Sequence, residues 1–177
     1  MMTKQGLSYL LTVTASVLVL LLARAQDTKP DANARPVISE GENSSGEPKI
    51  SKSEAEWKAQ LTPEQYAVMR LGQTERAGSC PLLREHRAGV FRCVGCGAAI
   101  FAADGKFDSG TGWPSFWKPI DEKRLRMVKD ESFGMERNEI LCARCGSHLG
   151  HVFDDGPKPS GLRYCINGVA LKFEPRE

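Results

Sequence analysis

The five residues RYCIN at positions 163–167 place a lone cysteine between an arginine and an asparagine. In a β-strand, Arg163, Cys165 and Asn167 share one face, and Tyr164 and Ile166 point into the core. A positive charge beside a cysteine favours the thiolate, which is the nucleophilic form. The alternative is a buried, unreactive thiol, but arginine and asparagine neighbours suit an apolar interior poorly. The segment therefore predicts that Cys165 is a nucleophile.

Four other cysteines form two matching pairs, in each of which two residues separate the cysteines and a glycine follows the second. The pairs are Cys93 with Cys96 and Cys142 with Cys145. This spacing lets both sulfurs of a tight turn face one point, and two such turns supply four thiolates for tetrahedral zinc. Disulfides are the alternative in an exported protein, but the matching turns favour zinc. We expect a closed, structural zinc site that pins two distant hairpins together.

The second cysteine pair runs into the segment HLGHVF, residues 148–153, which carries two of the three histidines of the chain. A rigid metal turn nearby would hold the rings of His148 and His151 in fixed positions. Histidine placed in this way can hydrogen-bond or protonate a reacting oxygen near neutral pH. A lone histidine is more often structural, but two in one short segment favour a functional role, with His151 the stronger candidate.

A Gly/Pro-rich loop between the cysteine pairs carries three large aromatic side chains, Trp113, Phe116 and Trp117. At least one of them is expected to be plain core packing. A loop-borne tryptophan, however, is also a surface on which a small apolar group such as an S-methyl packs.

The elements that position these residues lie within residues 51–177, which have the size of one domain. Helices are predicted over residues 51–61 and after a capping box at Thr62 and Gln65. Beyond Gly72, short apolar runs between turn residues predict a compact antiparallel β domain. The runs are residues 89–92, 99–101, 126–128, 139–141 and 152–153, and Val169, Leu171 and Phe173 are expected to continue an apolar C-terminal strand.

The N-terminus predicts an exported protein. Lys4 precedes an uncharged, Leu- and Val-rich run at residues 6–22, and small residues follow at 23 and 25, the positions that a signal peptidase reads. We expect residues 1–25 to be a signal peptide, with an uncleaved membrane anchor as the alternative. Residues 26–50 are polar and rich in Pro, Gly and Ser, which predicts a flexible linker.

The charge of the chain argues against a nucleic-acid partner. The net charge is +2, and cleavage after residue 25 removes Lys4 and Arg24 but no acid, which leaves 0. A nucleic-acid binder needs a basic excess. Two rival classes stay open: a non-enzymatic zinc module would leave Cys165 and the histidines idle, and an exported dithiol oxidoreductase would use a cysteine pair for redox chemistry and hold no metal.

Several motifs occur in the order typical of one family. They are KFDSG (106–110), GWPSF (112–116), the two cysteine pairs, HLGHVF (148–153) and RYCIN (163–167). From about residue 51 to the C-terminus, the chain resembles the B-type methionine sulfoxide reductases. The resemblance implies a mainly β, β-tent-like fold of two antiparallel sheets with short N-terminal helices and structural zinc. It also implies reduction of the R epimer of methionine sulfoxide, chiefly in oxidised proteins, by a monomer that a thioredoxin-like protein regenerates.

The resemblance also implies a role for each matching residue. Cys165 would be the nucleophile and would become a sulfenic acid. Three polar residues would hold the substrate and polarise its oxygen: His148, His151 and Asn167. Three more would contact the substrate, the first of them through its S-methyl group: Trp113, Phe153 and Arg163. The metal ligands of the family match Cys93, Cys96, Cys142 and Cys145.

Two positions depart from the family pattern. Many members carry a resolving cysteine, which condenses with the sulfenic acid, between the two glycines before the tryptophan, but this chain has Thr111 there. The residue after Asn167 is commonly a hydroxyl residue in the family, and here it is Gly168. With four cysteines held on zinc, Cys80 is the remaining candidate for the resolving thiol.

Overall fold

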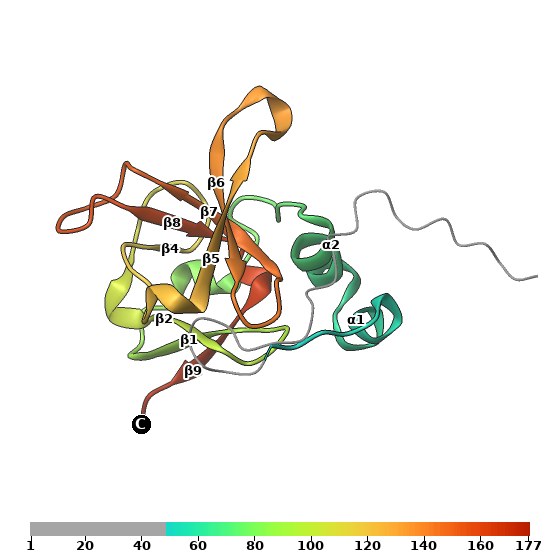
Figure 1. Cartoon of the computed structure of the whole chain (residues 1–177). Coiled ribbons are helices and arrows are strands. Elements are labelled where there is room, and N and C mark those ends of the chain that lie inside the picture. Colours follow the sequence, from blue (N-terminus) through green and yellow to red (C-terminus); the bar gives the residue numbers. More distant parts are fainter. Residues whose placement is uncertain (1–48) are drawn as a thin grey trace, which may run out of the picture. The chain divides into compact units, whose positions relative to one another are not determined.

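The computed structural model of the protein describes residues 49–177. The predicted signal peptide and all but the end of the predicted linker lie outside the described residues. The described part is mainly β, with two antiparallel sheets and two short helices (Figure 1). No helix in this part of the chain is both long enough and apolar enough to cross a membrane.

Two capped helices open the described domain. Helix α1 spans Glu54–Gln60 and helix α2 spans Pro63–Leu71. Each begins with a capping box, at Ser53 and at Thr62, because the side chain of the cap and that of the third helical residue satisfy backbone N–H groups reciprocally. The capping box predicted at Thr62 is confirmed. Helix α2 packs against strand β7 (His148–Phe153), so the helices brace the sheet that carries the histidines (Figure 1).

The strands form a three-stranded and a six-stranded sheet. The smaller sheet has the order β2 (Ala99–Ala102), β1 (Gly89–Cys93) and β9 (Leu171–Pro175). The larger sheet has the order β3 (Lys106–Phe107), β4 (Ser115–Phe116), β8 (Arg163–Ile166), β7, β6 (Arg137–Cys142) and β5 (Leu125–Asp130). The short strands predicted from the apolar runs are confirmed, as is the mainly β class.

Aromatic side chains from both sheets form the centre of the core. Phe101 of β2 stacks on Phe116 of β4 with ring centroids 4.3 Å apart, and Phe91 of β1 meets Phe116 edge-on at 5.0 Å. Tyr164 of β8 closes the group against Phe101. All four rings are buried. Because buried aromatic rings contribute large apolar areas, this cluster holds the two sheets together behind the catalytic candidates.

The prediction of one continuous C-terminal strand was wrong. Strand β8 ends at Ile166, the 3-10 turn η5 spans Gly168–Ala170, and β9 then pairs in the other sheet. The backbone N–H groups of Gly168 and Val169 donate to the carboxylate of Glu75 instead of a neighbouring strand. This interaction turns the chain from one sheet into the other directly after Asn167.

Candidate active site

A pocket of about 120 Å³ opens beside Cys165. Five residues predicted from the sequence line it: Trp113, His151, Phe153, Cys165 and Asn167. Three that were not predicted complete the wall: Thr74, Arg137 and Gly150. The strands bring these residues together because β8 pairs with β7 in a register that sets Cys165 opposite His151.

Cys165 is a free, half-buried thiol at the wall of this pocket. Burial raises its pKa, because the low-dielectric surroundings disfavour the thiolate, while a hydrogen bond from Thr111 and the charge of Arg163 act in the opposite direction. The hydroxyl of Thr111 lies 4.0 Å from the sulfur. The nearby arginine was expected to favour the thiolate, but burial outweighs its effect and the net pKa of the thiol is raised.

His151 and Arg137 line one side of the pocket, and both contact Asp130 of the β5–β6 hairpin. The Nε2 atom of His151 lies 2.8 Å from a carboxylate oxygen of Asp130, which also accepts a 2.8 Å hydrogen bond from Arg137. Burial lowers the pKa of His151, and the partly opposing effect of Asp130 does not reverse this. The ring is therefore neutral at pH 7, with Nε2 as the donor to Asp130.

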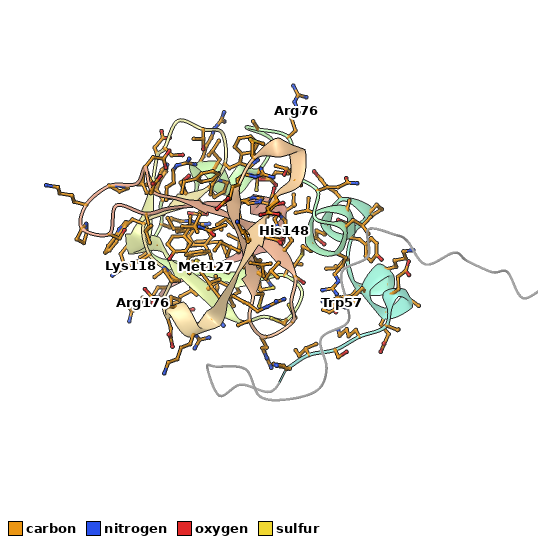
Figure 2. The ribbon with its side chains drawn as sticks, turned by 45° about the horizontal axis from the view of Figure 1, so that its top comes forward. Trp57, Arg76, Lys118, Met127, His148 and Arg176 are labelled. Carbon is orange, nitrogen blue, oxygen red and sulfur yellow. The ribbon has the colours of Figure 1, made fainter. Side chains whose placement is uncertain are left out.

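His148 lies behind His151 rather than in the pocket wall, with the ring centroids 5.4 Å apart. A register shift where β6 pairs with β7 brings both rings to the same side although three positions separate them. The Nδ1 atom of His148 lies 2.6 Å from a carboxylate oxygen of Glu139. Its Nε2 atom is buried and has no hydrogen-bond partner within residues 49–177. Figure 2 shows His148 among the crowded side chains of the domain interior.

Glu75 positions the side chains of both Asn167 and Trp113. No local sequence pattern distinguishes this residue from a solvent-exposed loop acid. The amide nitrogen of Asn167 donates to the carbonyl of Leu149 at 3.1 Å, and its amide oxygen accepts from the backbone N–H of Glu75 at 3.0 Å. The indole N–H of Trp113 donates to the carbonyl of Glu75 at 3.1 Å. Both side chains are thereby held at the pocket by the same loop residue.

Arg163 lies beside the pocket, next to Phe153. Its guanidinium carbon is 4.4 Å from the centre of the Phe153 ring, a favourable cation–π distance. Two parallel hydrogen bonds of 2.8 and 2.9 Å join it to Asp155. Arg163 is buried, although the sequence pattern placed it on a polar strand face. This geometry fixes the Phe153 ring that lines the pocket.

Cys80 is not among the residues that line the pocket. It is a free, buried thiol whose pKa burial raises, and it packs against Gly168. A Cβ atom at residue 168 would collide with the Cys80 sulfur, so the glycine makes room for this thiol. The Cys80 sulfur thus lies next to Gly168, the residue that follows Asn167.

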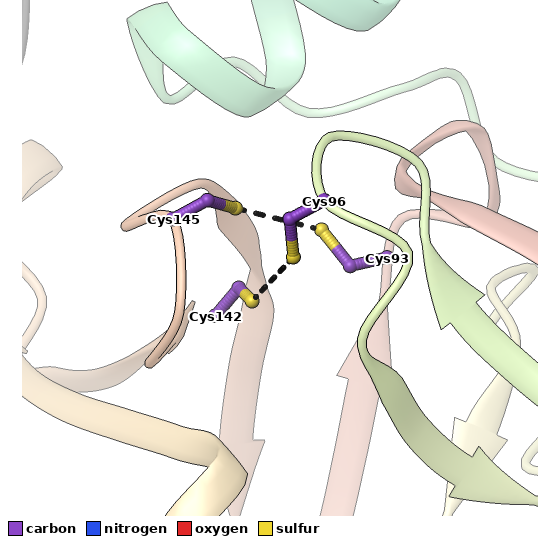
Figure 3. A group of neighbouring side chains, drawn as sticks. All are labelled: Cys93, Cys96, Cys142 and Cys145. Carbon is purple, nitrogen blue, oxygen red and sulfur yellow. Dashed lines mark hydrogen bonds between the residues drawn. The ribbon is translucent and has the colours of Figure 1, made fainter. Parts of the chain in front are cut away.

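The remaining four cysteines converge into one cluster (Figure 3). The sulfur of Cys93 lies 3.7 Å from that of Cys145, and Cys96 lies 3.5 Å from Cys142. These separations are too long for a disulfide bond of about 2.05 Å. Zinc bound to thiolates at about 2.3 Å in a tetrahedron places the sulfurs about 3.8 Å apart. The donor set and its spacing therefore suit a zinc ion.

The two turns of the cluster have the same backbone geometry. The N–H of Gly97 donates to the carbonyl of Cys93, and the N–H of Gly146 to that of Cys142, each at 2.8 Å. Both glycines have positive φ, 76° and 68°, which most other residues rarely adopt. One turn joins β1 to β2 and the other joins β6 to β7, so the cluster links the two sheets as the spacing predicted.

Arginines lie close to both turns of the cluster. Arg144 donates to the carbonyl of Cys96 at 2.9 Å, and Arg92 donates to the carbonyl of Gly97 at 3.1 Å. Their positive charges lie where four thiolates on a dication would leave excess negative charge.

A free thiol, an imidazole and an indole converge on a pocket apart from the four-cysteine cluster, an arrangement that suits an enzyme with a cysteine nucleophile better than a zinc-dependent binding module. The family model described as "SelR domain" matches residues 61–175, and the chain belongs to this family.

Three of its relatives carry the name "Peptide methionine sulfoxide reductase MsrB". The protein of Bradyrhizobium diazoefficiens is 55% identical over 128 residues, which are 72% of this chain and 92% of the relative. The protein of Leptospira interrogans is 51% identical over 125 residues, 71% of this chain and 95% of the relative. The protein of Pseudomonas putida is 52% identical over 129 residues, 73% and 98% of the two chains. The resemblance noted from the motifs is confirmed.

Proposed function

We propose that this chain reduces the R epimer of peptide-bound methionine sulfoxide to methionine, with the free amino acid as an alternative substrate. The observation that carries the proposal is the position of the half-buried Cys165 thiol in a small pocket with Trp113 and His151. Trp113 offers a flat apolar surface for the S-methyl group. His151, with His148 behind it and Asn167 beside it, supplies polar atoms around the sulfoxide oxygen.

The atoms and electrons of the first step are all supplied by the substrate and the residues of the site. The sulfur of Cys165 attacks the sulfoxide sulfur to form an S–S bond, and the thiol proton is transferred to the oxygen with the imidazole of His151 as the relay. The S–O bond breaks and releases that oxygen as hydroxide, which then attacks the Cys165 sulfur and breaks the S–S bond. Methionine leaves and Cys165 remains as sulfenic acid, so substrate sulfur is reduced and enzyme sulfur is oxidised. The Cys165 thiol, whose pKa is raised by burial, therefore supplies the proton that the oxygen needs.

Outside the pocket, we propose one structural zinc ion held by Cys93, Cys96, Cys142 and Cys145. A closed site of four thiolates leaves no position for substrate, and the ion would act on stability. The proposed partners are oxidised proteins and a thioredoxin-like reductant, and the proposed state is a monomer. Residues 1–25 support export to the periplasm or cell exterior, with a membrane anchor as the alternative.

A single-turnover assay tests the reaction. The enzyme is mixed with an excess of each separated sulfoxide epimer, without external reductant, and released methionine is measured. We expect close to one methionine per chain from the R epimer and none from the S epimer. Equal turnover of both epimers, or none of either, contradicts the proposal. Zinc measured on the same sample distinguishes the reductase from a dithiol enzyme that uses a cysteine pair, since the latter would be metal-free.

For recycling, we propose that Cys80 resolves the sulfenic acid. Condensation of the Cys80 thiol with Cys165 sulfenic acid forms a disulfide and releases water. The four clustered cysteines would be occupied by zinc, and Thr111 carries no sulfur. Cys80 is buried against Gly168 and does not line the pocket, so the proposed pairing requires Cys80 to leave this position.

We expect Cys80→Ser to spare the first turnover but to abolish most thioredoxin-driven recycling, which requires a disulfide. Dithiothreitol should restore much of the rate, because it reaches the sulfenic acid directly. Thr111 offers the matched control: its hydroxyl lies 4.0 Å from the Cys165 sulfur, so Thr111→Cys added to Cys80→Ser should rescue recycling. Peptide mapping of the wild type after one equivalent of substrate should show Cys80 linked to Cys165. A lasting sulfenic acid with free Cys80 would refute the pairing.

A further inference from the structure

Glu75 forms four hydrogen bonds with residues at or next to the pocket. One oxygen of its carboxylate accepts the N–H of Gly168 at 2.6 Å and the other accepts the N–H of Val169 at 2.9 Å. Its own N–H donates to the Asn167 side chain at 3.0 Å, and its carbonyl accepts the Trp113 indole at 3.1 Å. Side chain and backbone of one residue thus reach two walls of the pocket.

Glu75 is buried, whereas its neighbours in the loop are exposed. Its exposed fraction is 4%, whereas its neighbours Thr74 and Arg76 are exposed, and Arg76 projects outward in Figure 2. A carboxylate is rarely buried unless both oxygens are satisfied. Both oxygens of Glu75 accept backbone N–H groups, an arrangement that favours the ionised form. Burial raises the pKa of this carboxyl, and the bonds from Val169 and Gly168 oppose that rise.

From these contacts we infer that Glu75 is the positioning residue that holds Trp113 and Asn167 in place. Through Trp113, Glu75 also determines the selectivity of the pocket for a methyl group on the sulfoxide sulfur. The inference rests on the proposed function. Glu75 does not line the pocket, so it acts through the two residues that it holds. The carboxylate anchors its backbone to the turn after Asn167, and the same backbone carries the acceptor for the indole.

Glu75→Gln is the decisive substitution because it keeps the size of the side chain. An amide has one acceptor oxygen and one NH₂ group, so one of the two N–H donors of the turn faces another donor. The backbone of residue 75 then shifts, and the indole loses its fixed acceptor. Glu64→Gln is the matched control, since Glu64 is an exposed acid near Glu75 that forms no hydrogen bond with Trp113 or Asn167 within residues 49–177.

The measurement is single-turnover reduction of two R-sulfoxides, N-acetylmethionine sulfoxide and its S-ethyl analogue, over a range of concentrations. With Glu75→Gln we expect the efficiency for the methyl substrate to fall about tenfold, the effect of one lost charge-assisted hydrogen bond. The half-saturating concentration should rise, and the preference for methyl over ethyl should shrink. Glu64→Gln should match the wild type in all three quantities.

A purely structural role would lower the amount of active enzyme, which reduces both rates by one factor and leaves the methyl preference and half-saturation unchanged. That result, or a variant with wild-type values, overturns the inference. Melting curves identify a variant that fails to fold, in which case Glu75→Asp replaces it, because it keeps the charge but withdraws the carboxylate from the turn. A wild type that reduces neither sulfoxide refutes the proposed function and the inference with it; an active wild type with unchanged selectivity in the variant refutes the inference alone.

Discussion

Cys165→Ser is expected to abolish reduction of R-methionine sulfoxide and to leave the fold intact. The hydroxyl is close in size to the thiol, so the contacts of the site with Thr111 and His151 persist. Only the attacking atom changes, and a serine hydroxyl is a weak nucleophile at its ordinary pKa. Single-turnover methionine release measures the effect without any contribution from recycling. Retention of more than a few per cent of wild-type activity would remove Cys165 from the proposed role.

The control for this substitution is Cys80→Ser, which removes the other cysteine outside the metal cluster. It should release close to one methionine per chain in the same assay. Both variants should keep the wild-type metal content and melting temperature within a few degrees. Loss of single-turnover activity in Cys80→Ser as well would show that the assay responds to thiol content in general.

The second large effect concerns the four-cysteine cluster. Serine at any one of its positions, Cys93, Cys96, Cys142 or Cys145, is expected to eliminate stoichiometric zinc and to lower the melting temperature markedly. The cluster joins the β1–β2 turn of one sheet to the β6–β7 turn of the other. Binding free energy at such a site is folding free energy, on the order of 10 kcal/mol. Elemental analysis and calorimetry of each variant beside the wild type provide the measurement.

Cys165→Ser is the control here, since it changes a cysteine that lies apart from the cluster. A wild-type protein purified without chelators that holds no zinc would contradict the prediction. A cluster variant that melts at the wild-type temperature would show that the metal contributes little to the stability of the fold.

Local signals predicted much of the fold and part of the site. The cap at Thr62, the apolar runs and the two cysteine turns are each encoded within a few neighbouring residues, and all appear where expected. The break after Ile166 was not predicted because its cause is distant in sequence: the carboxylate of Glu75 captures the N–H groups of Gly168 and Val169, more than 90 positions away.

The supporting acids of the histidines were missed for the same kind of reason. Asp130 and Glu139 reach His151 and His148 only after β5, β6 and β7 pair. The two histidines share a side only because β7 is irregular where it pairs with β6. A strict alternation along a strand would have separated them, so sequence spacing alone indicated their importance but not their arrangement.

Gly168 and Cys80 also constrain how relatives of this chain can diverge. Because a Cβ at residue 168 would collide with the Cys80 sulfur and lie 2.7 Å from the Cys80 Cβ, a serine or threonine can be accepted at 168 only after the loop that carries residue 80 has been rebuilt. The two positions should therefore covary among relatives, although 88 positions separate them. A glycine after the asparagine of the RYCIN segment would then mark, in the sequence alone, a protein that keeps the side chain of residue 80 packed at this place.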